Sequence, residues 1–145
     1  MSVAERVIEE HTVLGRKCSV TIEGPDGDRR FNAYVKETAS GRLLTRNPVR
    51  GRSVDDVRDR ALQVMQNLLG IERIQEEVLA VVAEVAPGAS VDLTEDAQAI
   101  RAALTGPWEL EVPFAVSRDE LEEGLDIESL RLRILEHFHS HLREP

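Results

Sequence analysis

The periodicity of the apolar residues changes near Ser53, and this change constrains the fold more than any other feature of the sequence. Before Ser53, apolar residues alternate with polar ones in short runs that glycine and proline turns separate. After it, they recur every three or four residues over a long segment. Alternation is typical of half-buried β-strands and the longer period of amphipathic helices, so the sequence predicts an α+β fold with a small antiparallel sheet.

Two alternating runs before the switch, 17–23 and 30–37, predict a β-hairpin. The segment Gly24-Pro25-Asp26-Gly27 between them is a strong turn signal. A short third strand is expected around 43–46, and the alternating segment 108–116 is a candidate fourth strand at the sheet edge, because Pro113 cannot donate a ladder hydrogen bond. The side chains expected to face the core from the hairpin are Cys18, Val20, Ile22, Phe31, Ala33 and Val35.

Capping patterns and helical periods predict that four to five helices pack against this sheet. The number depends on whether Gly70 divides 53–86 into two helices or lies within one bent helix. Within this segment, Val64 and Leu68 are expected in the core. The expected helices are 2–14, 53–69, 71–86, 94–105 and 126–142, with a short helical turn at 117–123.

The chain has 145 residues, which is the usual size of one domain. We therefore predict a single α+β domain over 1–145. Pro87–Asp92 is the best candidate for an internal boundary, since it interrupts the helical period with proline and glycine. It would divide the chain into subregions 1–88, with the sheet and the helical pair, and 89–145, with a helix, a strand and a helix.

The net charge of −9 and the scarcity of aromatic residues argue against nucleic-acid binding, which relies on phosphate neutralisation and base stacking. The expected order of one helix, three strands and one helix is similar to arrangements in double-stranded-RNA-binding domains, HicB-type antitoxins and secretion chaperones. Asp55 and Asp56, however, stand at the helix start, where RNA binding needs positive charge. No apolar run approaches the ~20 residues of a membrane span, and residues 1–10 carry charges throughout, so we expect a cytoplasmic protein.

Six arginines gather between residues 42 and 60 of this acidic chain. Guanidinium groups bind phosphate and carboxylate groups well, so Arg46, Arg50 and Arg52 are candidate residues for holding an anionic ligand between the sheet and the helix that follows. The alternative is a solvated surface in which Asp55–Arg58 and Asp56–Arg60 form ion pairs at helical spacing.

His137 and His141 are four residues apart and would share one face of the last helix, so they are candidate metal ligands. The alternative is that they complement the negative end of the helix dipole. Cys18 cannot form an internal disulfide, because it is the one cysteine in the sequence. Its alternating context predicts a small buried apolar residue rather than a nucleophile.

Acidic residues outnumber basic ones strongly between 109 and 128, which makes this region a candidate surface for a basic protein partner. No catalytic motif and no cofactor motif is present, so the sequence favours a non-enzymatic interaction or regulatory module without a cofactor. Long apolar stripes at 71–85 and 127–142 further predict a homodimer. The alternative is a small-molecule-binding domain or enzyme that uses Arg46, Arg50 and Arg52.

The acidic residues of the region 109–128, the candidate surface for a basic partner, are Glu109, Glu111, Asp119, Glu120, Glu122, Glu123, Asp126 and Glu128.

Overall fold

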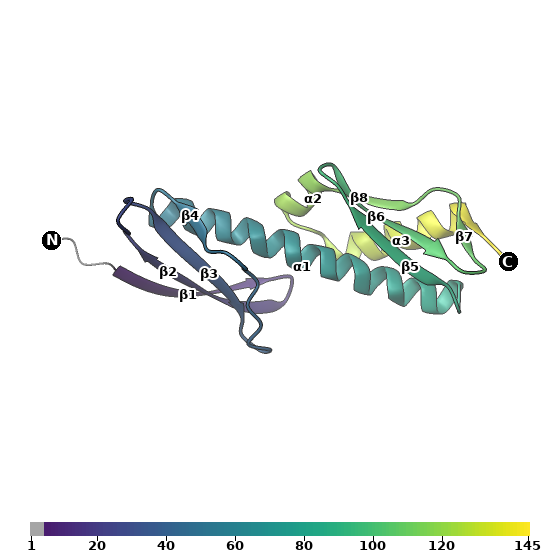
Figure 1. Cartoon of the computed structure of the whole chain (residues 1–145). Helices are drawn as coiled ribbons and strands as arrows, with labels where there is room; N and C mark the ends of the chain where they lie inside the picture. Colours follow the sequence, from purple (N-terminus) through teal and green to yellow (C-terminus); the bar gives the residue numbers. More distant parts are fainter. Residues whose placement is uncertain (1–4) are drawn as a thin grey trace. The chain divides into compact units, whose positions relative to one another are not determined.

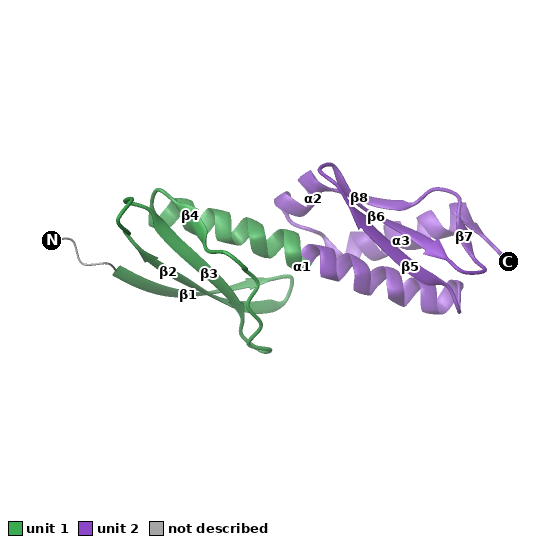
Figure 2. Ribbon diagram, viewed as in Figure 1, with its two compact units in different colours: residues 1–69 green, residues 70–145 purple. Residues whose placement is uncertain are grey.

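The computed structural model describes residues 5–145. These residues form two compact units, which meet between Leu69 and Gly70 of the sequence and are called unit 1 and unit 2 (Figure 2). The long helix α1, Val54–Val85, begins in the first unit and ends in the second. The single domain expected over 1–145 therefore stays a prediction.

Unit 1 contains a four-stranded antiparallel sheet in the order β1-β2-β3-β4 (Figure 1). The expected hairpin is confirmed by β2, Arg16–Gly24, and β3, Phe31–Glu37, which pair with Val20 opposite Val35. The third strand expected at 43–46 is wrong in position, because Leu43 forms only an isolated bridge with Lys36 and the strand β4 covers Val49–Gly51.

The helix expected at 2–14 is wrong. Residues Glu5–Val13 form strand β1, which pairs along its whole length with β2, while Ser2 of the expected cap lies outside the described residues. The two-residue loop Leu14-Gly15 explains the difference, since both residues have positive φ, 52° and 77°, as a tight hairpin turn requires.

The core of unit 1 lies between the sheet and the first half of α1. Residues of α1 spaced by four form one buried stripe, which packs on the inner face of β2 and β3. Val64 and Leu68, expected in this core, are only half-buried, because the stripe runs one position away from them. The buried residues are Cys18, Val20, Ile22, Ala33, Val35, Val57, Ala61, Met65 and Leu69.

Helix α1 is one continuous helix of 32 residues, so Gly70 does not divide it. Its start follows the expected capping pattern, because the Asp56 backbone N–H donates to the Ser53 hydroxyl oxygen at 3.0 Å. Gly70 is buried, and its missing side chain leaves room for Leu121 of helix α2.

Unit 2 contains a three-stranded antiparallel sheet in the order β5-β6-β8 and a separate two-stranded pair, β7-β9. Helix α3, which Asp126 caps as expected, buries Leu130, Ile134 and Phe138. Helix α2 has Ser117 as its N-cap and Gly124 as its C-cap, also as expected. The elements are β5 (Ser90–Glu95), β6 (Ala99–Thr105), β7 (Glu109–Leu110), β8 (Phe114–Ser117), α2 (Arg118–Glu123), α3 (Ile127–His141) and β9 (Leu142–Arg143).

The fold class needs correction in its number of helices, since residues 5–145 form three helices and not four to five. The alanine-rich segment 94–105, expected to be a helix, is mostly strand β6, which lies between β5 and β8 and pairs with both. The strand expected at 108–116 is interrupted at 111–113. Its two parts, β7 and β8, have different partners, and β8 is an edge strand of its sheet.

Candidate functional site

A hollow of about 270 Å³ lies in unit 1 where β4 meets the start of α1. The register between β3 and β4 places Phe31 opposite Gly51, so Arg30 and Arg52 lie just beyond the paired residues at the same end of the sheet. Helix α1 then starts directly and brings Arg60 to the same hollow. The lining residues are Arg30, Arg50, Gly51, Arg52, Asp56 and Arg60.

Gly51 lets the strand approach the helix closely. A Cβ atom at this position would lie 2.8 Å from Oδ2 of Asp56 and 2.9 Å from the backbone nitrogen of Val57. No substituent fits in that space without a shift of the helix start. Glycine at residue 51 thus allows the close contact between β4 and the helix start, and Arg50 and Arg52 flank this contact.

Asp56 supplies the one carboxylate among the lining residues. Its Oδ2 accepts the backbone N–H of Arg52 at 2.8 Å, and its Oδ1 accepts Nε of Arg60 at 3.3 Å. The Arg52 hydrogen bond is the main reason that the pKa of Asp56 is lowered, with Arg60 contributing. The Asp56–Arg60 pair expected at helical spacing is confirmed.

Arg50 is held from the other side by the loop between β2 and β3. Its Nη2 lies 3.0 Å from Oδ2 of Asp26 and 3.5 Å from Oδ2 of Asp28. Asp26 also accepts the backbone N–H groups of Asp28 and Arg30 and the side-chain amide of Asn32. These bonds, that of Arg30 first, lower the pKa of Asp26 to about 2, so it stays ionised and ties the loop to the hollow.

Arg30 and Arg52 differ from Arg50 and Arg60 in having no internal partner for their charge. Within the described residues 5–145, neither guanidinium forms a hydrogen bond or an ion pair. Arg52 is exposed and Arg30 half-buried, so both guanidinium groups can reach an external anion.

Of the three predicted ligand residues, the structure brings Arg50 and Arg52 together and leaves Arg46 out. Arg46 is exposed in the loop before β4 and does not line the hollow. Arg30 was missed, because its place in an alternating run suggested a solvated strand face. Arg30 can be recognised as a lining residue only from the pairing of β3 with β4. The sequence analysis instead predicted the third strand at 43–46.

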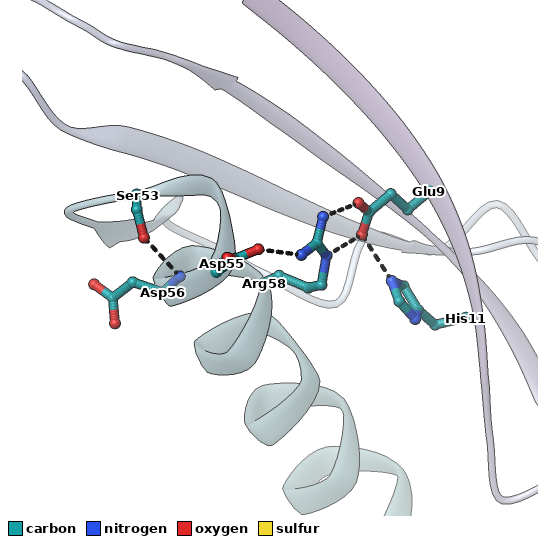
Figure 3. Close-up of polar contacts among 6 residues, drawn as sticks. All are labelled: Glu9, His11, Ser53, Asp55, Asp56 and Arg58. Carbon is teal, nitrogen blue, oxygen red and sulfur yellow. Dashed lines mark hydrogen bonds and ion pairs between the residues drawn. The ribbon is translucent and has the colours of Figure 1, made fainter.

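A second polar network joins the inner face of β1 to α1 (Figure 3). Nε of Arg58 donates to Oε1 of Glu9 at 2.7 Å, and its Nη2 contacts the other oxygen of the same carboxylate. Nη1 of Arg58 donates to Asp55 at 2.7 Å, which confirms the expected Asp55–Arg58 pair. His11 completes the network, with its Nε2 at 3.0 Å from Glu9.

The bidentate contact with Arg58 is the main reason that the pKa of Glu9 falls to about 2, while the pKa of Arg58 is raised in turn. All four side chains already have partners within the protein, so this network holds the edge strand β1 on the helix. It leaves no group with the unpaired charge that a ligand site needs.

The two histidines predicted as metal ligands do lie together in unit 2, with ring centroids 4.6 Å apart. His137 places Nε2 at 2.6 Å from the carbonyl oxygen of Val112 and packs edge-on against Phe114. In the part of the chain that the structure describes, no group of three or more His, Cys, Asp or Glu side chains is arranged to hold a metal ion.

Part of the acidic region 109–128 is engaged within unit 2. Arg133 donates to both carboxylate oxygens of Glu120 at 2.8 Å, and Nε of Arg143 donates to Glu111 at 2.5 Å.

Cys18 is fully buried in unit 1, as the sequence predicted, and burial raises the pKa of its thiol.

Comparisons with protein-family models, with curated proteins and with solved structures found no match to this chain. Among residues 5–145, no helix combines the length and the apolar character that crossing a membrane requires.

Proposed function

We propose that the protein is a binding module whose arginine-lined hollow takes an anionic group, a phosphate or a carboxylate, of a small ligand. The observation that carries this proposal is the convergence of Arg30, Arg50, Arg52 and Arg60 on one hollow, with two of the four guanidinium groups lacking an internal partner among residues 5–145. No enzymatic step is part of the proposal.

The chemistry of arginine supports an oxyanion as the ligand. A guanidinium presents its N–H donors in a planar fork that matches two oxygens of a phosphate or carboxylate. Four such groups and one carboxylate give the lining of the hollow a formal charge of +3, on a chain whose net charge is −9. The local field thus has the opposite sign to the molecule as a whole, which favours a small anion over a large polyanion.

The size of the hollow also supports a small group. Its volume of about 270 Å³ is just below the range of roughly 300–1,000 Å³ that drug-sized ligands occupy. It suits the anionic head of a metabolite more than a whole extended molecule. Arg50 and Arg60, already oriented by Asp26 and Asp56, would contribute without a large loss of side-chain entropy.

Inorganic phosphate is the probe that tests this proposal, with binding followed by NMR on the backbone amides and the arginine Nε–H signals. Ionic strength is held constant with sodium chloride, because screening alone shifts the signals of exposed charges. We expect dissociation in the millimolar range, with the largest changes at residues 50–52. Arg52→Gln should weaken binding about tenfold or more, which corresponds to the loss of one charge-assisted hydrogen-bonding partner.

Arg46→Gln is the matched control, because it removes the same charge from the same segment outside the hollow. Equal weakening by both variants would mean that phosphate responds only to the general positive charge of the segment, and would overturn the proposal. The interaction module expected from the sequence, with the acids of 109–128 as its partner surface, and its cytoplasmic location remain predictions.

A further inference from the structure

Strand β1 is an open edge of the four-stranded sheet. Within the described residues it pairs with β2 alone, over all nine of its positions, while β4 ends the sheet on the other side. Ile8, near the middle of β1, has 64% of its surface exposed. A long edge strand with an exposed apolar residue at its centre is a template for pairing with another strand.

The hairpin turn determines which backbone groups of β1 are open. In a two-residue hairpin loop the flanking residues, here Val13 and Arg16, form a hydrogen-bonded pair. The register with β2 continues without a bulge, so odd-numbered residues of β1 direct their N–H and C=O groups at β2. Arg6, Ile8 and Glu10 therefore direct theirs at the open edge.

We propose that two copies of this chain pair through β1, antiparallel, about a twofold axis at Ile8. In this register Ile8 meets the partner's Ile8 as a hydrogen-bonded pair, and Arg6 meets the partner's Glu10 in the same way. The open backbone groups of each strand then meet those of the other. The two sheets become one sheet of eight strands.

Charge complementarity selects this register over its neighbours. Because Arg6 and Glu10 are equally far from Ile8, the twofold axis creates two ion pairs across the new strand pair, on either side of the Ile8 contact. A twofold axis at Arg6, Glu9 or Glu10 would place that residue opposite its own copy, with like charges in contact. An axis at Val7 would place Glu9 opposite the partner's Glu5.

The present partners of Arg6 and Glu10 do not oppose this pairing. Arg6 lies 3.4 Å from Glu23 and Lys17 lies 3.9 Å from Glu10, and all four side chains are about half exposed or more. Exposed ion pairs of this kind contribute little, so they can be shared or exchanged. No residue of the arginine-lined hollow lies on β1, and the proposal is therefore independent of anion binding.

Sedimentation equilibrium over a wide range of concentrations tests the pairing, with charge reversal as the probe. Arg6→Glu places a carboxylate opposite the partner's Glu10 twice, and should weaken the dimer by about tenfold or more. Combining it with Glu10→Arg restores opposite charges and should recover most of the dimer. Lys36→Glu, an exposed charge reversal on β3 away from the edge, is the matched control and should leave the dimer unchanged.

A cysteine cross-link tests the register directly, and does so even if a charge variant folds poorly. Opposed residues of a hydrogen-bonded antiparallel pair have Cα atoms about 5.5 Å apart, within the range that a disulfide spans. Ile8→Cys should give a disulfide-linked dimer on mild oxidation, while Lys36→Cys and the parent chain with its buried Cys18 should not. A monomeric mass at high micromolar concentration, or a dimer that neither Arg6→Glu nor Ile8→Cys affects, would overturn the proposal.

Discussion

At the scale of single residues, the polar contacts of unit 1 separate charges with internal partners from charges without them. Arg58 is enclosed by Glu9 and Asp55, whereas Arg52 has only its backbone N–H engaged. Spacing in the sequence predicts pairs within a helix, such as Asp55–Arg58. It does not predict Glu9–Arg58, whose members are 49 residues apart and meet only because β1 is a strand.

The lowered pKa of Glu9 predicts how stability depends on pH. The pKa is about 2 in the folded protein against an ordinary value of 4.5, chiefly because of Arg58. A carboxyl group whose pKa is lower when folded stabilises the protein above its unfolded pKa, and this contribution is lost as the pH falls through the folded pKa. Glu9→Gln should therefore lower the free energy of unfolding by about 1–3 kcal/mol at pH 7.

Urea unfolding of the two proteins between pH 7 and pH 2 measures this difference. We expect it to shrink as the pH falls from about 4.5 to about 2. Glu122→Gln, which changes an exposed carboxylate on α2, should show almost no difference at any pH. A Glu9→Gln difference that stays constant with pH would mean that the carboxylate charge does not act through Arg58.

The arginine-lined hollow was only partly predictable, because its members come from segments that are separate in the sequence. The local excess of arginine pointed to Arg50 and Arg52, which line the hollow. Arg46 belongs to the same arginine-rich segment but lies outside the hollow, while Arg30, which lines it, directly precedes β3 and lies outside that segment. Membership of the hollow depends on the β3–β4 register, and neither composition nor periodicity encodes that register.

At the scale of elements, the sequence predicted most reliably where local signals agreed. A clear period coincides with turn or capping residues in the β2–β3 hairpin, at the start of α1, and at the N-caps of α2 and α3. Strand β6 was missed because alanine favours helices locally, while pairing with strands on both sides decides its structure. Strand β1 was missed because its apolar residues do not alternate with polar ones: Val7 and Ile8 are adjacent, and the more buried positions include Glu9 and His11. A capping pattern at its start suggested a helix instead.

Gly70 gives a prediction at the element scale. Alanine normally stabilises a helix interior by about 1 kcal/mol relative to glycine. At this position, however, a Cβ would lie 2.5 Å from Cδ2 of Leu121, whose side chain is fully buried, so the leucine would have to shift within a packed core. Gly70→Ala should therefore destabilise the protein by about 1 kcal/mol in urea unfolding, despite its better helix propensity.

The sign should reverse in the background of Leu121→Ala, where the contact is gone. There Gly70→Ala should stabilise the protein by up to about 1 kcal/mol relative to Leu121→Ala alone. If the effect of Gly70→Ala is the same in both backgrounds, then close packing against α2 is not what keeps a glycine in the middle of α1.

At the scale of the whole molecule, the buried side chains of residues 5–145 fall into two sets, one in each unit. In unit 1 they come from the four-stranded sheet and the first half of α1. In unit 2 they come from the second half of α1, from β6 and β8, and from α2 and α3. Buried cores of this kind define the parts of a protein that open together. The sequence analysis placed its candidate internal boundary at Pro87–Asp92, after α1, whereas the two units meet within α1, between Leu69 and Gly70.

A matched pair of substitutions tests whether the two cores unfold separately. Ile22 of β2 and Ile134 of α3 are both fully buried, and Ile→Val typically costs about 0.5–1.5 kcal/mol at such sites. In native-state hydrogen exchange, Ile134→Val should accelerate the slowest amides of unit 2 about two- to tenfold and leave those of β2 and β3 nearly unchanged, while Ile22→Val should do the reverse. Equal acceleration in both units by either variant would instead show that residues 1–145 unfold as the single cooperative domain that the sequence predicts, with α1 transmitting the loss of packing from one core to the other.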